Sequence, residues 1–269
     1  MNLGQVMPRL RSILPIARFV DQPYRAVSKK FKEMKKLGQG AFGAAYSAKI
    51  GNQKVIVKTA VGTPGMVSRE EAAQTMVRET EILGKLQKYP FVPKLIEVGP
   101  DYYVQEDVGG ESMLHLLSQK GLEPRELLSA MVASGIIASV LHREGIAHND
   151  YELRNILLTP AGVVAIDFGI AIDREKDGED AFREAVAKDI TSVLENLMLV
   201  LTTRETPESV RIMLLSTVEK YRKMLMAGQV DEDTAQKISK DLLFAVAQLG
   251  AQHVRGKTVH RGLVKVIAV

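Results

Sequence analysis

Two short segments of the chain carry acidic and amide side chains whose spacing could support phosphoryl transfer. Residues 148–155 read HNDYELRN and residues 166–169 read IDFG, so together they supply Asp150, Asn155 and Asp167. One acid can accept or orient the proton of a hydroxyl, and the amide and the second acid can hold Mg²⁺ against nucleotide phosphates. Either segment alone is a weak signal, but their order, with a short expected hairpin between them, is far less expected by chance.

A glycine-rich segment lies upstream, between two expected strands. Residues 37–43 read LGQGAFG and place glycine at positions 38, 40 and 43. Glycines at this spacing allow positive φ and let backbone N–H groups approach phosphates closely. The segment runs into a strand instead of a helix, and no acidic residue ends a second strand about 20 positions later, which disfavours a dinucleotide-binding fold.

Lys58 follows the apolar run Val55-Ile56-Val57 at the end of an expected strand. A lysine that alternates into a core is costly unless it meets an anion or a carboxylate. An isolated lysine at a strand end would more often be a surface residue. Its position 15 residues after the glycine-rich segment favours a phosphate contact instead.

In this order the segments resemble the catalytic parts of eukaryotic-like protein kinases, over roughly residues 34–200. The resemblance implies a bilobal α+β fold with a β-rich N-terminal lobe and a helical C-terminal lobe. It also implies ATP and Mg²⁺ as cofactors, with Lys58 on the α- and β-phosphates, Asp150 on the acceptor hydroxyl, and Asn155 and Asp167 on the metal. The residues that would contact the nucleotide from the glycine-rich segment are Gly38, Gly40, Phe42 and Gly43.

The same resemblance implies a carboxylate partner for Lys58 on an expected helix over residues 68–87. Glu79 shares a stripe with apolar residues of that helix, whereas Glu81 is turned about 200° away at 100° per residue. We therefore predict Glu79 as the partner. By the same resemblance, the backbone carbonyl of Glu106 and the N–H of Val108 would face the adenine edge, with Gln105 guarding a deeper pocket.

The sequence also departs from the kinase pattern. Asn149 stands where many regulated kinases have an arginine that receives an activation-loop phosphate, which favours activity without that control. Glu152 stands where serine/threonine kinases usually place a lysine that contacts the γ-phosphate, and Arg154, four residues after Asp150, could supply this positive charge instead. Residues 170–188 are too few for both a long activation loop and a peptide-positioning segment, so the resemblance is to a minimal kinase with a truncated activation segment.

Several elements must position these residues. The expected strands cover residues 34–37, 44–50, 54–59, 94–98 and 102–106, and the expected helices cover residues 68–87, 124–142, 180–201, 207–227 and 233–252. Ser68 and Glu71 form a plausible capping box for the first helix, and residues 189–192 resemble the start of a central helix. We predict a basic extension over residues 1–30, an N-lobe over 31–108 and a C-lobe over 109–269.

The composition is that of a globular protein and argues against membrane-spanning and cysteine-dependent classes. The 269 residues are 46% hydrophobic and 25% charged, contain no cysteine, and include no long apolar stretch that would span a membrane. The absence of cysteine excludes disulfides and thiol catalysis. The net charge is +4, but through Lys58 the chain has twelve basic residues and only two acidic ones. That basic part could be a solvated face, a nucleic-acid or lipid contact, or a secretion segment; no nucleic-acid partner is expected.

The leading hypothesis is an ATP- and Mg²⁺-dependent kinase that phosphorylates serine or threonine in a protein substrate. One alternative is a small-molecule phosphotransferase of the antibiotic-kinase type, and another is a kinase-fold binding module. We expect a cytoplasmic protein. The small size also resembles effector kinases that bacteria inject into host cells by type III secretion, so delivery to a host cytosol stays an open alternative.

Overall fold

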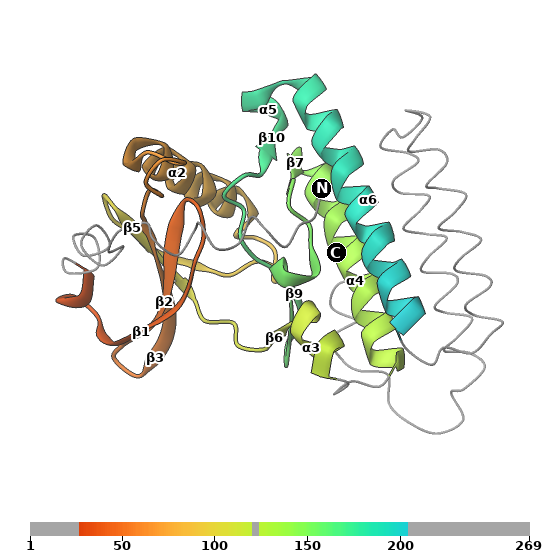
Figure 1. The fold of residues 1–269 in the computed structure, drawn as a ribbon, viewed down its shortest axis with the longest axis horizontal. Helices are drawn as coiled ribbons and strands as arrows, with labels where there is room; N and C mark the ends of the chain where they lie inside the picture. The colour runs from red at the N-terminus through yellow and green to blue at the C-terminus, as the bar shows by residue number, and fades with distance from the viewer. Residues whose placement is uncertain (1–26, 120–123, 204–269) are drawn as a thin grey trace, which may run out of the picture. The chain divides into compact units, whose positions relative to one another are not determined.

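The structure, a computed structural model, describes residues 27–119 and 124–203 (Figure 1). Within them, residues 27–76 and 96–105 form one unit, and the remaining described residues form a second. The predicted lobe boundaries stay predictions, and residues 77–95 group with the second unit. The predicted helices over residues 207–227 and 233–252, and most of the predicted N-terminal extension, lie outside the described residues.

The first unit is built on a five-stranded sheet with the strand order β1-β2-β3-β5-β4. Its strands are β1 (Lys32–Gln39), β2 (Gly43–Ile50), β3 (Gln53–Ala60), β4 (Leu95–Val98) and β5 (Tyr102–Glu106). β2 and β3 pair antiparallel along their whole length. The predicted strand positions are therefore confirmed to within a few residues at each end.

Alternation along β3 sets the direction of Lys58. Val55 and Val57 are fully buried in a core cluster with Phe31 and Val104. Successive side chains of a strand point to opposite faces, so Lys58 lies on the other face, where it is half-buried. The apolar run before Lys58 thus fixes which face of the sheet carries the ammonium group.

Helix α2 (Arg69–Leu86) begins with the predicted capping box. The Ser68 N–H donates to Glu71 Oε2 at 2.7 Å, and the Glu71 N–H donates to Ser68 Oγ at 3.1 Å. The predicted apolar stripe is buried, and Glu79 is buried with it at 5% exposure, whereas Glu81 is exposed. The helix and the orientation of Glu79 on it are confirmed.

The second unit is mainly helical and includes short strand pairs. Its helices are α3 (Met113–Gln119), α4 (Pro124–Arg143), α5 (Arg174–Asp177) and α6 (Glu179–Thr203), with a 3-10 turn η4 (Leu153–Asn155). Its strands are β6 (Glu111–Ser112), β7 (Ile146–Ala147), β8 (Ile156–Thr159), β9 (Gly162–Ala165) and β10 (Ile172–Asp173). α4 and α6 pack side by side (Figure 1). The predicted α+β class is confirmed.

Helix α6 confirms the expected helix over residues 180–201, since it runs from Glu179 to Thr203. The separate expectation that residues 189–192 begin a helix is wrong, because Asp189 lies in the interior of α6. The acidic residues Glu179 and Asp180 in its first turn favour this earlier start because they interact well with the helix N-terminus. The segment between Gly169 and α6 holds only β10 and α5, as expected for a truncated activation segment.

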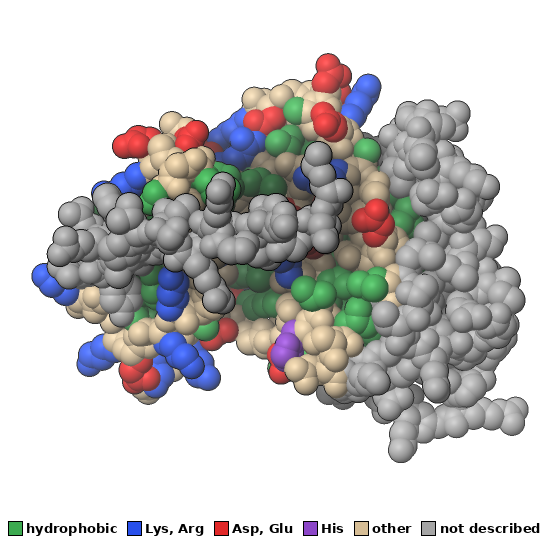
Figure 2. Space-filling model, viewed as in Figure 1, with side chains coloured by type: hydrophobic (Ala, Val, Ile, Leu, Met, Phe, Trp, Pro, Cys, Tyr) green, Lys and Arg blue, Asp and Glu red, His purple; other side chains and the backbone are tan. Residues whose placement is uncertain are grey.

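Basic side chains, drawn in blue, gather over the strands of the first unit (Figure 2). Lys32, Lys35, Lys36 and Lys54 are exposed there, and Lys49 is partly buried. Helices long and apolar enough to cross a membrane are absent from the described ranges.

Candidate active site

Three predicted residues of the loop before β8 meet in one hydrogen-bonded group. The Asn155 side-chain amide donates to the Asp150 carbonyl and to Asp150 Oδ2, both at 2.9 Å. Arg154 Nη2 donates to the two carboxylate oxygens of Asp150 at 2.9 and 3.0 Å. The turn η4 makes this possible, since it brings positions 154 and 155 back toward position 150. The Asp150 carboxylate is therefore oriented from two sides.

Arg154 also forms an ion pair with Glu152. The hydrogen bond to Asp150 raises the pKa of Arg154, and the charges of Asp150, Glu152 and Asp167 add to the effect. The guanidinium is thus shared between two carboxylates of its own loop. Its predicted role as a cation for the γ-phosphate stays a prediction, and the structure adds a second role, which is to orient Asp150.

The buried carboxylate of Asp189 supports the loop 148–155, and it is not among the site residues predicted from the sequence. Asp189, with no exposed surface, accepts the backbone N–H groups of His148 and Asn149 at 2.7 Å each. It also accepts from His142 Nε2 at 3.0 Å. The sequence held one signal for it, because Asp189 lies on an α6 face with apolar neighbours such as Val186 and Val193, and a buried acid needs partners.

The backbone at two site residues is strained. Asn149 and Asp167 have φ of 63° and 69°, in the left-handed region that non-glycine residues rarely adopt. Among the described non-glycine residues only Glu33 shares this property. Such strain costs about 1–3 kcal/mol and clusters at functional sites. Here the strained backbone lies in the two segments, 148–155 and 166–169, whose side chains are predicted to carry out the chemistry.

The segment after β9 is bonded both to the loop and to helix α2. The Ile166 N–H donates to the Asn155 carbonyl at 2.9 Å. Asp167 therefore follows directly on a residue that is bonded to the loop 148–155. The Phe168 N–H donates to Glu79 Oε1 at 3.1 Å. The buried Phe168 ring packs 4.7 Å from the His148 ring, whose Nε2 donates to the Ile166 carbonyl at 2.9 Å. The His148 side chain therefore contacts both the Phe168 ring and the backbone before Asp167.

In the first unit, the glycine-rich segment forms the turn from β1 to β2. The Gly40 N–H donates to the Gly43 carbonyl at 2.8 Å. A Cβ at Gly43 would lie 2.6 Å from the Thr59 carbonyl oxygen, so no larger residue fits there. Among the described residues, no atom lies within 4 Å of a Cβ built at Gly38 or Gly40, and Phe42 is 37% exposed.

The remaining predicted residues lie toward the ends of two strands, Lys58 in β3 and Gln105 and Glu106 in β5. Lys58 faces Ala45 in the β2–β3 register, and its Nζ lies 5.8 Å from the centre of the Tyr103 ring. Glu106 ends β5, and its N–H donates to the Lys94 carbonyl at 2.8 Å. Gln105 is buried, at 6% exposure. The nucleotide contacts assigned to Lys58, Glu106 and Val108 stay predictions.

The donor atoms of the predicted metal residues suit Mg²⁺. Mg²⁺ prefers oxygen ligands, and Asn155 and Asp167 offer an amide and a carboxylate oxygen. Both N–H bonds made by the Asn155 amide go to Asp150, which leaves its Oδ1 available for a ligand. No group of three or more acidic, histidine or cysteine side chains forms a metal cage by itself within the described residues. Phosphate oxygens of a nucleotide would complete the ligand set.

The fold and these contacts define a protein kinase domain. The family model for the protein kinase domain matches residues 31–193, and the chain belongs to this family.

Three relatives illustrate the similarity. A probable serine/threonine-protein kinase of Clostridium perfringens is 26% identical over 153 residues, which make up 55% of this chain and 22% of that protein. The serine/threonine-protein kinase AtPK2/AtPK19 of Arabidopsis thaliana is 30% identical over 154 residues, or 55% of this chain and 32% of that protein. Protein kinase C eta type of Mus musculus is 29% identical over 148 residues, or 52% and 21%. The chain thus spans a third or less of the length of these relatives.

Proposed function

We propose that the chain is an ATP- and Mg²⁺-dependent protein kinase that transfers the γ-phosphate to a serine or threonine hydroxyl. The observation that carries this proposal is the group formed by Asp150, Arg154 and Asn155, with Asp167 following directly on a residue bonded to the loop. The family and the serine/threonine kinases among the relatives support the type of acceptor.

Each site residue has a proposed part in the reaction. Asp150 orients the acceptor hydroxyl and takes its proton, and Arg154 and Asn155 keep the carboxylate in position. Asn155 and Asp167 would hold Mg²⁺, which when bound neutralises charge on the phosphate oxygens. Lys58 would contact the phosphates, and the backbone at Gly38 and Gly40 would face them.

Transfer of radiolabelled γ-phosphate to proteins tests this function. Asp150→Asn keeps the size of the side chain but removes the base, so we expect a loss of about 10²–10⁴-fold in turnover. Glu179→Gln, on the exposed surface of α6, is the matched control and should retain wild-type turnover. Equal labelling by wild type and Asp150→Asn would contradict the proposal.

A small-molecule phosphotransferase is the second candidate, and Glu152 favours it. This position carries an acid that pairs with Arg154, where serine/threonine kinases usually place a lysine. Mass spectrometry of a lysate treated with wild type or Asp150→Asn separates the two functions. New phosphosites on proteins favour the first candidate, and a phosphorylated small acceptor with no new protein sites favours the second. A binding module with no catalysis would give neither, while still capturing its target.

We also propose that phosphorylation of the segment after Phe168 does not control the enzyme. No serine, threonine or tyrosine occurs from Phe168 to Ile190, and Asn149 replaces the usual phosphate-receiving arginine. Instead, the Asn149 amide donates to the Ile170 carbonyl at 3.0 Å. Phosphatase treatment should therefore leave the initial rate within about twofold of the untreated enzyme, since such control is normally exerted by new phosphate–arginine contacts. A large loss of rate would contradict this.

For the site of action we propose a cytosol, in the producing cell or in a host cell after secretion. The absence of cysteine is compatible with both. Cell fractionation of an infected or mixed culture, with an antibody to the chain, distinguishes them, and recovery only from an extracellular fraction would contradict the proposal.

A further inference from the structure

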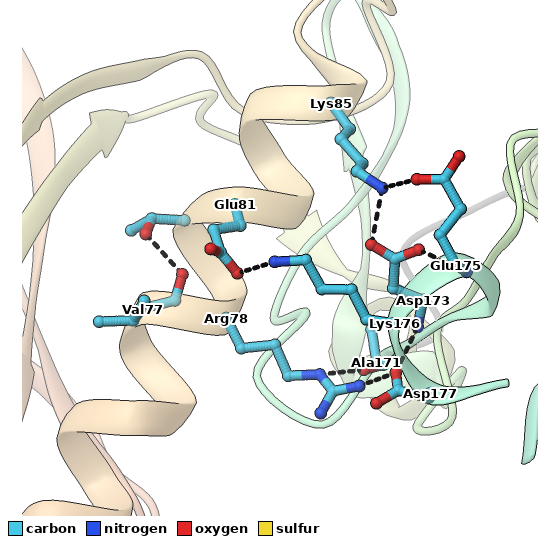
Figure 3. A network of polar contacts seen from close by, with 10 residues as sticks. Val77, Arg78, Glu81, Lys85, Ala171, Asp173, Glu175, Lys176 and Asp177 are labelled. Carbon is cyan, nitrogen blue, oxygen red and sulfur yellow. Dashed lines mark hydrogen bonds and ion pairs between the residues drawn. The ribbon is translucent and has the colours of Figure 1, made fainter.

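The short segment after Phe168 is attached to helix α2 by a set of ion pairs (Figure 3). Arg78 Nε donates to the Ala171 carbonyl at 2.8 Å, and Arg78 Nη2 forms an ion pair with Asp177. Lys85 Nζ donates to Asp173 Oδ2 at 2.8 Å and to Glu175 Oε2 at 2.8 Å. Arg78 therefore contacts both ends of the stretch 171–177, and Lys85 contacts its middle.

A further ion pair joins the same two elements at the surface. Lys176 Nζ donates to Glu81 Oε2 at 2.6 Å, with both side chains about half exposed at 49% and 48%. Exposed pairs contribute little. The contacts of Arg78 and Lys85 are the ones that can resist motion of the helix.

Two of the acids involved also order the segment itself. Asp173, whose side chain is 4% exposed, accepts the Glu175 N–H at 3.1 Å and so caps α5. Asp177 accepts the Asp173 N–H at 2.8 Å through the same oxygen that pairs with Arg78. Hydrogen bonds to Asp173 and Glu175 raise the pKa of Lys85, so this lysine keeps its charge. These carboxylates are thus bonded on one side to their own segment and on the other to the helix.

The spacing of these contacts along α2 restricts its rotation. Arg78 and Lys85 are seven residues apart, about two helical turns, and therefore lie on the same side of the helix. Glu79 follows Arg78 directly and accepts the Phe168 N–H. A rotation of α2 about its axis would break the contacts of Arg78, Glu79 and Lys85 together.

The segment side of these contacts consists of aspartate and glutamate side chains. The stretch from Phe168 to Ile190 contains no hydroxyl that could be phosphorylated. The contacts between the segment and α2 therefore form without any modification of the segment.

We propose that Arg78 with Asp177, and Lys85 with Asp173, are positioning residues that lock α2 to the β10–α5 segment and thereby hold Glu79 and Phe168 in the arrangement needed for phosphoryl transfer. This inference rests on the proposed kinase function. The carboxylates of β10–α5 act in place of a phosphate group, so the locked arrangement is built into the fold.

A double-mutant cycle on the full chain tests the proposal. The variants are Arg78→Gln, Asp177→Asn and the two together, with Arg183→Gln as a control that breaks the exposed Glu179–Arg183 pair of α6. We expect each single variant to lower kcat about tenfold, with KM for ATP within about twofold of wild type. The double variant should lose clearly less than the product of the two single losses, because both substitutions remove the shared Arg78–Asp177 contact. Arg78→Lys, which keeps the charge but not the planar fork, should recover part of kcat. The control should match wild type.

Hydrogen exchange supplies a readout that needs no activity. The amides of Phe168 and Asp173, which donate to Glu79 and Asp177, should exchange at least tenfold faster in Arg78→Gln and Asp177→Asn than in wild type. Faster exchange together with the lower kcat supports the proposal. Faster exchange with unchanged kcat overturns it, because the contacts would then be structural only. Unchanged exchange also overturns it.

Absence of phosphate transfer by the wild type would refute the proposed function, but it would not refute the attachment of α2 to β10–α5 through Arg78 and Lys85. Exchange alone then decides: the faster rates support a lock between α2 and β10–α5, and unchanged rates overturn it.

Discussion

At the scale of single residues, the site combines an oriented acid with a strained one. Asp150 is held by Arg154 and Asn155, while Asp167 is kept at φ 69°. Left-handed backbone costs an L-residue about 1–2 kcal/mol, although aspartate and asparagine tolerate it better than most. Strain of this kind persists only where surrounding contacts impose it. Here those contacts include the hydrogen bonds of the adjacent Ile166 and Phe168 amides.

Asp167→Asn separates charge from backbone strain. Asparagine tolerates the left-handed region, so we expect the melting temperature to stay within a few degrees of wild type. Loss of the charge that we propose to bind Mg²⁺ should lower turnover by about 10²–10⁵-fold. Calorimetry and a kinase assay on the same preparations check both results. Asp167→Ala should lose a similar amount of turnover and also some stability, and a melting temperature far below that of the Asn variant would confirm the strain. Normal turnover in Asp167→Asn would exclude Asp167 from the reaction.

Asp189→Asn tests the buried acid beneath the loop. Its two oxygens accept three N–H groups, and asparagine offers only one oxygen and adds a donor among them. A buried donor without an acceptor costs about 1–3 kcal/mol, and more for groups that interact with a charge. We therefore expect the free energy of unfolding in urea to fall by about 3 kcal/mol. An unchanged value would mean that the N–H groups find other acceptors.

At the scale of elements, helix α2 connects local sequence signals to the site. Its start depends on the capping box of Ser68 and Glu71, and its second half carries Arg78, Glu79 and Lys85. Helix caps of this kind typically contribute about 1 kcal/mol. A substitution at the cap should thus lower the free energy of unfolding with little effect on turnover.

The cap predicts a pH dependence. The hydrogen bond from the Ser68 backbone, and then that from the Ser68 side chain, lower the pKa of Glu71 below its ordinary value of 4.5. A lowered pKa means that the stabilisation is fully present above pH 4.5 and is lost as the pH falls through the folded-state value. The difference in unfolding free energy between wild type and Glu71→Gln should therefore shrink as the pH falls from 6 to about 3. A difference that grows in this range would contradict the capping contact.

At the scale of the whole molecule, ligand binding should couple to folding. The proposed nucleotide contacts belong to residues far apart in the sequence, from Gly38 to Asp167. A ligand that binds only the folded state stabilises it by an amount that grows with its concentration, about 2.7 kcal/mol at 100 times Kd. Stability measured with nucleotide thus reports on nucleotide binding by the folded chain.

We expect ATP with Mg²⁺ to raise the melting temperature by several degrees and ATP with EDTA to raise it much less, because Asn155 and Asp167 would act through the metal. For a domain of this size about 1 kcal/mol corresponds to roughly 2–4 °C. Differential scanning fluorimetry of wild type and Asp167→Asn checks this. The variant should lose most of the Mg²⁺-dependent part, and an equal shift in both proteins would argue against the metal assignment.

The parts of the protein that could be predicted from sequence were those governed by local periodicity and spacing. Strand alternation placed Lys58, the 3.6-residue period placed Glu79 on the buried face of α2, and the capping box marked the start of that helix. The order of Asp150, Asn155 and Asp167 indicated the chemistry. These signals are short-range, since each depends on residues within about twenty positions of one another along the chain.

Only the tertiary structure decided the supporting contacts. Asp189 lies about forty residues from His148 and Asn149, and Arg78 lies 99 residues from Asp177. No periodicity links such distant positions, and a charged residue in a helix reads as solvated until the fold buries it beside a partner. The chain by itself determined which groups could carry out phosphoryl transfer. The fold determined what holds them, because burial turns isolated charges into hydrogen-bonded supports.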